Sequence, residues 1–242
     1  MTARVAVLSD VHGNLPALDA ILGALAPFDA VWQMGDVVGY GPHPVEVIQR
    51  LQSLGALGVR GNHDAAAIGE IGTEWFNDAA RIAVEWSARQ LTDGASRWLE
   101  TLPRSRVEGE FTIVHGSPRD PLWEYLYSTS VARANFDAFE TPCCLVGHTH
   151  VPLVFRALDD RVETILPQDG TVLALDRRRV IVNPGGVGQP RDGDPRASGA
   201  LLDTTSGTIT WRRVPYPIAA TQEAMRRAGL PQRLVDRLDL GL

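Results

Sequence analysis

Residues 4–14 read RVAVLSDVHGN, a short apolar run that ends in a cluster of polar and reactive side chains. The apolar residues predict a strand over 4–9, and the polar residues after it predict a loop at the carboxyl end of that strand. Asn14 is a typical helix N-cap, Pro16 suits the first helical turn, and the spacing of LPALDAILGAL predicts a helix. The stretch therefore predicts a strand–loop–helix unit with reactive groups in its loop.

The same unit recurs along the first half of the chain. AVWQMGD at 30–36 precedes a helical pattern near 44–54, and ALGVRGNHD at 56–64 leads into an alanine-rich segment. Strands that alternate with helices predict an α/β fold. Further helical patterns lie near 77–90, 92–101 and 129–139, and further strands lie at 111–116 and 143–148.

The sequence changes character after residue 150. Short β-rich segments, from VPLVFRAL at 151–158 to TITWRRV at 208–214, alternate with Gly, Asp and Pro. This punctuation predicts a second sheet built mostly from hairpins. Helical patterns at about 217–240 follow. We therefore expect a single α/β domain over residues 1–242, with two mixed sheets, helices outside them, and these last helices as an appendage.

Composition excludes several classes of protein. Of the 242 residues, 44% are hydrophobic and 21% are charged, which suits a globular chain that buries a sizeable core. The formal net charge of −6 argues against general nucleic-acid or anionic-membrane binding. All 23 basic residues are arginine, which excludes a lysine Schiff base and a P-loop lysine.

Two features bear on the cellular compartment. Cys143 and Cys144 are adjacent in an apolar run, where neighbouring strand residues point to opposite faces, so neither a disulfide nor a shared metal is expected. The first residues are typical of a strand rather than of a signal peptide, and no apolar run reaches 18 residues. We expect a cytoplasmic protein without a membrane span, and a homo-oligomer stays open.

Five of the six histidines follow expected strands and stand beside Gly, Asp or Asn. The carboxyl ends of strands in an α/β sheet line up along one edge, so loops that are distant in sequence converge there. Imidazoles mixed with carboxylates and one amide oxygen suit Mn, Fe, Zn or Ni, and about eight such groups are too many for one ion. The clusters are Asp10-Val-His12, Gly35-Asp36, Gly61-Asn62-His63-Asp64, His115-Gly116 and Gly147-His148-Thr149-His150.

Each cluster taken alone also has an ordinary explanation. A histidine after a strand is often a hydrogen-bonded loop residue, and Gly-Asn pairs are common in turns. Their recurrence at the same structural place favours a shared function. Gly35, Gly61 and Gly147 each precede a candidate ligand, where a missing side chain allows close approach of the backbone.

Five motifs resemble, in order and approximate spacing, those of the calcineurin-like metallophosphoesterase superfamily: DVH at 10–12, GDVVGYG at 35–41, GNHD at 61–64, VHG at 114–116 and GHTH at 147–150. The resemblance implies a four-layer α/β/β/α sandwich with a two-metal site at the strand ends. It also implies an enzyme, a metal-dependent hydrolase of phosphoric esters.

The resemblance assigns a role to each matching residue. It implies that the first metal is held by Asp10, His12 and His150, and the second by Asn62, His115 and His148, with Asp36 bridging the two. It further implies that His63 is the catalytic histidine and that Asp64 is the acid that orients it. A supporting hydrogen-bond role is the alternative for His63.

Two motifs indicate the branch of the superfamily. Protein serine/threonine phosphatases and symmetrical diadenosine tetraphosphatases extend the second motif to GDxxDRG, whose arginine binds phosphate, whereas Gly39-Tyr40 stands here. NPGGVGQPR at 183–191 resembles the NPGSxxxPR segment of the small prokaryotic phosphodiesterases, with Gly186 in place of serine. The resemblance therefore favours hydrolysis of phosphodiesters, nucleotides or dinucleoside polyphosphates by a metal-bridging hydroxide.

Residues that would contact the substrate are harder to recognise. Arg119 and Arg191 lie in loops and are candidates to bind phosphate, with a solvated loop or a structural ion pair as the alternative. Tyr40 and Trp123 are candidates to stack on a nucleobase. Tyr125 is expected to pack its loop onto the core instead. The expected partner is a small phosphate ester or nucleotide.

Two other functions stay open. A phosphoprotein phosphatase is disfavoured because the Asp-Arg pair of that branch is missing at Gly39-Tyr40. A non-catalytic protein-binding scaffold is disfavoured because every ligand position is present and His63 is kept.

Overall fold

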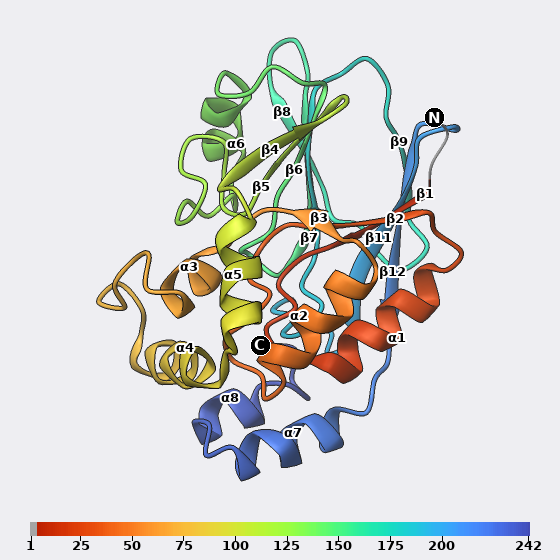
Figure 1. Cartoon of the computed structure of the whole chain (residues 1–242). Helices are drawn as coiled ribbons and strands as arrows, with labels where there is room; N and C mark the ends of the chain where they lie inside the picture. The colour runs from red at the N-terminus through yellow and green to blue at the C-terminus, as the bar shows by residue number, and fades with distance from the viewer. Residues whose placement is uncertain (1–3) are drawn as a thin grey trace.

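The structure, a computed structural model, describes residues 4–242. Two six-stranded mixed sheets lie face to face, and helices cover their outer faces (Figure 1). This confirms the predicted α/β/β/α arrangement. In chain order the elements are β1 (Arg4–Leu8), α1 (Leu15–Leu25), β2 (Ala30–Gln33), α2 (Pro44–Ser53), β3 (Leu57–Gly58), α3 (Asn62–Ala67), α4 (Asp78–Gln90), α5 (Asp93–Thr101), β4 (Ser105–Glu108), β5 (Phe111–Val114), α6 (Thr129–Phe136), β6 (Cys143–Leu145), β7 (Pro152–Ala157), β8 (Val162–Ile165), β9 (Val172–Ala174), β10 (Val180–Pro184), β11 (Ala197–Asp203), β12 (Thr208–Val214), α7 (Ile218–Arg227) and α8 (Gln232–Asp236).

Strand β1 contributes to two apolar layers at once. Val5 and Val7 pack between the two sheets, whereas Ala6 and Leu8 pack beneath α1 and α2. Alternate side chains of a strand point to opposite faces, and both faces of this sheet are covered. Residues 5–8 of the strand are therefore all apolar instead of alternating with polar residues.

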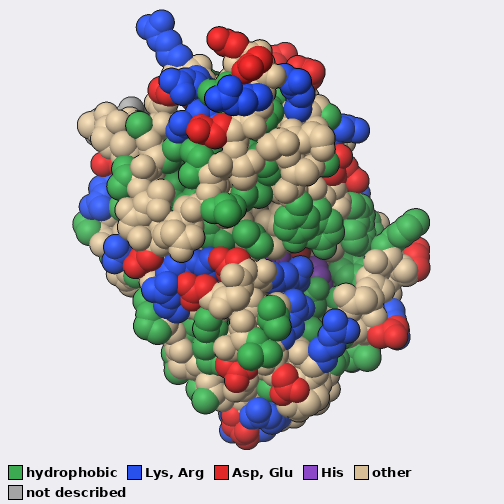
Figure 2. Space-filling view, turned by 180° about the vertical axis from the view of Figure 1, so that it is seen from behind, with side chains coloured by type: hydrophobic (Ala, Val, Ile, Leu, Met, Phe, Trp, Pro, Cys, Tyr) green, Lys and Arg blue, Asp and Glu red, His purple; other side chains and the backbone are tan. Residues whose placement is uncertain are grey.

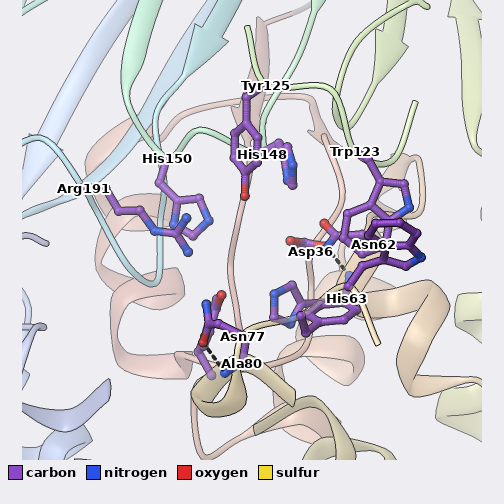
Figure 3. Close-up of a pocket in the computed structure, with 13 residues that line it drawn as sticks. Asp36, Asn62, His63, Asn77, Ala80, Trp123, Tyr125, His148, His150 and Arg191 are labelled. Carbon is purple, nitrogen blue, oxygen red and sulfur yellow. Dashed lines mark hydrogen bonds between the residues drawn. The ribbon is translucent and has the colours of Figure 1, made fainter. Parts of the chain in front are cut away.

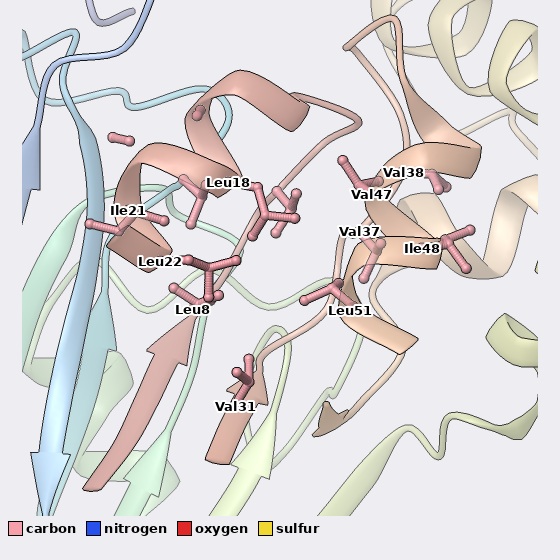
Figure 4. Packing of buried hydrophobic residues seen from close by; sticks show 14 of the residues in the cluster. Leu8, Leu18, Ile21, Leu22, Val31, Val37, Val38, Val47, Ile48 and Leu51 are labelled. Atoms are coloured by element: carbon pink, nitrogen blue, oxygen red, sulfur yellow. The ribbon is translucent and has the colours of Figure 1, made fainter. Parts of the chain in front are cut away.

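Figure 4 shows the outer layer on this side, where Leu18 and Leu22 of α1 and Leu51 of α2 lie over Leu8 and Val31 of the sheet. The helix α1 begins as the sequence predicts: Asn14 is its N-cap, and the Asn14 side chain accepts a hydrogen bond from the backbone N–H of Ala17 (3.3 Å).

Two further apolar layers complete the sandwich. The layer between the sheets contains the fully buried Trp211, and the outermost layer contains Phe136 of α6. Cys143 belongs to the first of these layers and Cys144 to the second. The adjacent thiols therefore face opposite sides, as predicted, and both are free.

The strands after residue 150 correct one expectation. They do not form a sheet of their own: β9, β11 and β12 join β1–β3, and β7, β8 and β10 join β4–β6. The strand β11 pairs antiparallel with β1, with Ala6 opposite Leu201. A hairpin pattern indicates that a strand has an antiparallel neighbour, but it does not show which sheet receives that hairpin.

Parallel pairing brings the reactive loops together. In one sheet β1, β2 and β3 run in parallel, and in the other β5, β6 and β10 run in parallel. The carboxyl ends of these strands lead into the loops that carry the predicted motifs. We refer to this side of the sandwich as the reactive edge.

The last two helices cover the reactive edge rather than extending away from it. Met225 of α7 and Leu234 of α8 pack against Tyr40 in a separate apolar cluster, and Figure 1 shows both helices below α1 and α2. Thr221 donates a hydrogen bond from its hydroxyl to Asn14 Oδ1 (3.2 Å). Within residues 4–242 no helix is long and apolar enough to cross a membrane.

Gly35 and Gly23 provide a matched test of the packing at the reactive edge. Gly35 has a φ of +89°, and a Cβ there would lie 2.7 Å from the backbone nitrogen of Gly61, whereas Gly23 in α1 has open space around it. We expect Gly35→Ala to lower the free energy of unfolding by about 1–3 kcal/mol. Gly23→Ala should raise it by about 1 kcal/mol. Urea unfolding of the metal-free protein measures the free energy of unfolding of both variants. A change of the same sign and size in the two variants would contradict the close packing at Gly35.

Candidate metal centre

Three groups of buried side chains at the reactive edge offer ligand atoms that lie within 4.8 Å of one another in each group. The groups are Asp10 with His12 and His150, Asp36 with His115 and His148, and His12 with Asp36 and His63. Six of the seven predicted ligands fall in these groups, and every member is at most 3% exposed. The seventh, Asn62, places its Oδ1 3.2 Å from His115 Nε2.

Asp36 lies between the groups. Its Oδ2 is 3.6 Å from His12 Nε2 and 3.3 Å from His115 Nε2, and its Oδ1 accepts a hydrogen bond from the backbone N–H of His63 (2.9 Å). His12 follows β1 in one sheet, and His115 follows β5 in the other. A single carboxylate therefore joins loops from both sheets.

Backbone carbonyl groups set the orientation of three imidazoles. A carbonyl oxygen can only accept a hydrogen bond, so the ring nitrogen facing it must carry the proton. The other nitrogen, Nε2, then has a free lone pair for a metal, as is usual for metal-binding histidines. The Nδ1 atoms of His12, His115 and His150 donate to the carbonyls of Val38 (3.0 Å), Met34 (2.8 Å) and Gln189 (2.6 Å).

Ring nitrogens of four of these histidines lie at short distances from one another. Nε2 of His12 is 3.2 Å from Nε2 of His150, and Nε2 of His115 is 3.0 Å from Nδ1 of His148. The buried Oδ1 of Asp10 has no hydrogen-bond partner among residues 4–242. Buried acceptors that face one another are stabilised by a cation between them, so these residues fit a divalent metal.

The pKa values of these buried side chains also reflect a local shortage of positive charge. Burial raises the pKa of Asp10 to about 7. Burial also acts to raise the pKa of Asp36, but the histidines around it, His115 foremost, hold it well below its usual range. Burial acts to lower the pKa of His115, and Asp36 nevertheless raises it to about 9. A proton on His115 thus neutralises Asp36, and a bound cation would compete with that proton.

The backbone of these loops is strained. Six non-glycine residues among 4–242 have a positive φ, and all six lie at the reactive edge. Such left-handed conformations cost about 1–3 kcal/mol each and cluster at functional sites. They turn the chain sharply after each strand and aim the side chains inward. The residues are Asp10 (+54°), His12 (+46°), Asp36 (+53°), Tyr40 (+53°), His148 (+64°) and His150 (+60°).

Asp64 makes different contacts from the one expected. Its Oδ2 accepts from the backbone N–H of Gly61 and its Oδ1 from that of Val38, each at 3.0 Å. Nδ1 of His63 has no hydrogen-bond partner in the described chain and lies against Gly39, where a Cβ would overlap it. Asp64 therefore fixes the start of α3 and the loop beside it, and it does not orient the His63 ring by a direct hydrogen bond.

The candidate metal-binding groups open into a cavity of about 70 Å³. Figure 3 shows Asp36, Asn62 and His63 on one side of it and His150 and Arg191 on the other. Figure 2 shows its mouth as a small patch of histidine surface beside arginine and among hydrophobic side chains. The cavity admits a small anionic group far more readily than a folded protein surface.

Three of the four predicted substrate contacts line this cavity. Tyr40, Trp123 and Arg191 do so, whereas Arg119 is not among the lining residues within 4–242. The guanidinium of Arg119 is half exposed and lies 3.8 Å from Glu124. Arg119 thus lies in a surface ion pair outside the lining of this cavity, and its binding of phosphate stays a prediction.

Arg191 has a different environment. Its Nη2 donates to Gln189 Oε1 (3.1 Å), its guanidinium lies 5.6 Å from the centre of the Tyr40 ring, and its Nε has no partner in the described chain. Within residues 4–242 no carboxylate forms an ion pair with Arg191. The guanidinium is therefore available to an anion in the cavity.

Several residues that line the cavity were not indicated by the sequence motifs. Tyr125 does not simply pack its loop onto the core, because it is 43% exposed and stacks on His148 with a centroid separation of 3.8 Å. Trp75, Phe76 and Asn77 also line the cavity. The available signal was a Trp-Phe pair directly before the helix N-cap Asn77, in the loop that follows the GNHD motif.

Buried histidines and aspartates at the shared edge of two sheets, in an α/β/β/α sandwich, define a metal-dependent phosphoesterase. The comparison with protein families agrees. The calcineurin-like phosphoesterase superfamily domain matches residues 3–207, and the chain belongs to this superfamily. The predicted resemblance is confirmed, and with it the activity class of a phosphoester hydrolase that uses divalent metal.

Similar proteins cover the chain to different extents. The crystal structure of a metallophosphoesterase from Sphaerobacter thermophilus is 47% identical, covers 100% of both chains and has a TM-score of 0.92. An uncharacterised protein of Methanocaldococcus jannaschii is 33% identical over 99% of this chain and 98% of its own length. A symmetrical bis(5′-nucleosyl)-tetraphosphatase of Aromatoleum aromaticum is 35% identical, over 36% of this chain and 33% of its own length.

His12 provides a test of the strain at the metal centre, because its φ is +46°. His12→Gly and His12→Ala remove the same imidazole, but only alanine keeps a Cβ in the left-handed conformation. We expect the metal-free glycine variant to be about 1 kcal/mol more stable than the alanine variant in urea unfolding.

The matched control is Arg81, which lies in the interior of α4. There Arg81→Ala should be more stable than Arg81→Gly by about 1 kcal/mol. The same order of stability at both positions would contradict a strained backbone at His12.

Proposed function

We propose that this chain hydrolyses phosphodiesters and nucleotide-type phosphoanhydrides, dinucleoside polyphosphates included, with two divalent metal ions per chain. The observation that supports it best is the position of Asp36 Oδ2 between His12 Nε2 (3.6 Å) and His115 Nε2 (3.3 Å). A carboxylate in that place would be shared by two ions, with a separate group of ligands on each side.

The ligands divide into two sets around Asp36. We assign Asp10, His12 and His150 to one ion and Asn62, His115 and His148 to the other, with Asp36 shared. Mn, Fe, Zn and Ni suit this mixture of imidazole and oxygen ligands. When bound, a metal pair activates water as a nucleophile and neutralises charge on the phosphoryl oxygens.

Arg191 supplies the further positive charge that a phosphate ester needs. Its guanidinium lines the cavity, lies over Tyr40 and pairs with no carboxylate in the described chain. Protein phosphatases of the superfamily carry their phosphate-binding arginine in the motif that here contains Gly39-Tyr40. We infer that Arg191, from the loop after β10, binds phosphate oxygens in its stead.

We assign His63 the role of proton donor to the leaving group. Its Nδ1 lies against Gly39, so Nε2 is the ring atom available to a ligand in the cavity. Burial lowers the pKa of His63 to about 4. An anionic ester beside the ring favours the protonated form, so the proton is best held when substrate is present.

A compact phosphate with an organic group fits this site better than a phosphoprotein. The inner cavity measures about 70 Å³ and is entered between aromatic side chains, Tyr125 and Trp123 among them. The partial match to symmetrical bis(5′-nucleosyl)-tetraphosphatases supports a nucleotide substrate. The symmetrical tetraphosphatases bind phosphate through the arginine of an Asp-Arg pair. Gly39-Tyr40 stands at that place here, so this chain does not bind phosphate through an arginine of that motif.

Asp36 provides the test of the metal pair. Asp36→Ala should lose bound metal and lower the turnover of bis(p-nitrophenyl) phosphate by at least about 100-fold. Asp36→Asn should also lose activity, yet its side-chain oxygen still accepts from the His63 N–H, which separates metal loss from misfolding. Metal analysis of purified variants and initial rates measure both effects.

The control is Asp78→Ala, because that side chain is 94% exposed at the start of α4. Two ions per chain with normal turnover in both Asp36 variants would contradict the metal assignment. Turnover of phosphopeptides with none of any diester or nucleotide would contradict the proposed substrate class.

Replacement of His63 tests the proton donor. His63→Ala should keep its metal and its fold, while kcat falls about 10²–10⁴-fold for an alkyl leaving group. The loss should be much smaller for p-nitrophenolate, which leaves without protonation. His43→Ala, a loop histidine outside the metal groups, is the control. Loss of metal would make His63 a ligand, and an equal loss of rate with both leaving groups would contradict its role as proton donor.

A further inference from the structure

A second hollow adjoins the reaction cavity, and two tryptophans are common to both. Trp75 and Trp123 line the reaction cavity, and they are also the residues of the described chain that line the outer hollow. The outer hollow measures about 460 Å³ against about 70 Å³ for the inner cavity. Sites for small molecules typically measure about 300–1,000 Å³. The outer hollow therefore has room for an organic group that the inner cavity cannot hold.

The loops that carry the tryptophans are attached to the catalytic elements. Trp75 lies in the loop at 69–76, between α3, which begins with Asn62 and His63, and α4. Trp123 follows β5 and His115, and its backbone N–H donates to Asp120 Oδ1 (3.2 Å). Both tryptophans thus lie in loops that adjoin the elements carrying the proposed metal ligands.

Phe76 connects the two tryptophan loops to His63. Its ring lies 4.9 Å from the His63 ring and 5.3 Å from the Trp123 ring, in both cases nearly edge to face. Figure 3 shows Trp123 at the side of the cavity where Asn62 and His63 lie. A continuous aromatic surface therefore runs from the proposed proton donor out to the hollow.

Trp75 has no structural role that accounts for its position. Its side chain is 81% exposed, and it belongs to none of the apolar clusters of the described chain. An indole left in water gains no burial energy, and exposed aromatic groups beside a cavity mark binding sites. Because the hollow is lined by two indoles and by no charged side chain of the described chain, it suits a planar, neutral occupant.

We propose that Trp75 and Trp123 form a clamp for the nucleobase of the substrate, which stacks on their indoles while the phosphate enters the inner cavity. This inference rests on the proposed function, and it names Trp75 as a residue that determines specificity. Every nucleobase has a π-face, so the clamp distinguishes esters with a planar base from esters without one, and not one base from another.

Two ligands that differ only in the base provide the test: adenosine 5′-monophosphate and ribose 5-phosphate. Calorimetric titration of the metal-loaded protein should show tighter binding of the adenosine compound. Trp75→Ala and Trp123→Ala should each weaken that binding by about 5–150-fold and leave ribose 5-phosphate unaffected. Trp75→Phe should restore most of the affinity. Leu166→Ala, at an exposed apolar residue outside both cavities, should change neither ligand.

The outcomes separate the clamp from the enzyme. Three results would overturn the clamp. The first is equal affinity of the wild type for both ligands, and the second is an equal loss of affinity for both ligands in Trp75→Ala. The third is a loss of affinity in Trp123→Ala but not in Trp75→Ala. In each of these cases turnover of bis(p-nitrophenyl) phosphate that depends on Asp36 would leave the proposed function intact. Absence of metal-dependent turnover of every diester and nucleotide would overturn the proposed function itself.

Discussion

The carboxylate of Asp36 is the contact on which the reactive edge depends. It lies between His12 and His115, which come from different sheets, and it accepts the backbone N–H of His63. A buried carboxylate surrounded by imidazole lone pairs is stable only with positive charge close by. The packing of the two sheets against each other therefore creates a site that needs a positive charge beside Asp36.

The strained loops follow from the same demand. Side chains at the ends of parallel strands must turn back over the sheet edge to meet one another, and a left-handed residue makes that turn in the fewest steps. Asp10, Asp36 and His148 adopt this conformation although each has a Cβ. The rigid three-layer core supplies the stability that holds them there, and Gly35 and Gly61 let the backbones of neighbouring loops touch.

A chain with a formal net charge of −6 can still attract an anion, because the attraction is local. Arg191 lines the cavity with no carboxylate partner in the described chain, and Tyr40 behind it packs against α7 and α8. The last helices therefore support the wall of the cavity that carries Arg191. The aromatic side of the cavity, with Phe76 and Trp123, provides the complementary apolar surface.

The local sequence determined the strand–loop–helix units, and with them the positions of the metal-binding residues. Each motif follows its own strand, and the rule that parallel strands end at one edge predicts that Asp10 and Asp36 meet, because both follow strands of one sheet. His115 follows a strand of the other sheet, and the packing of the two sheets against each other brings it to Asp36. Only the tertiary structure decided which sheet receives β11, that Arg191 and not Arg119 faces the cavity, and that Trp75 stands beside Trp123. These outcomes depend on contacts between loops that are far apart in the chain, and no local periodicity or spacing encodes such contacts.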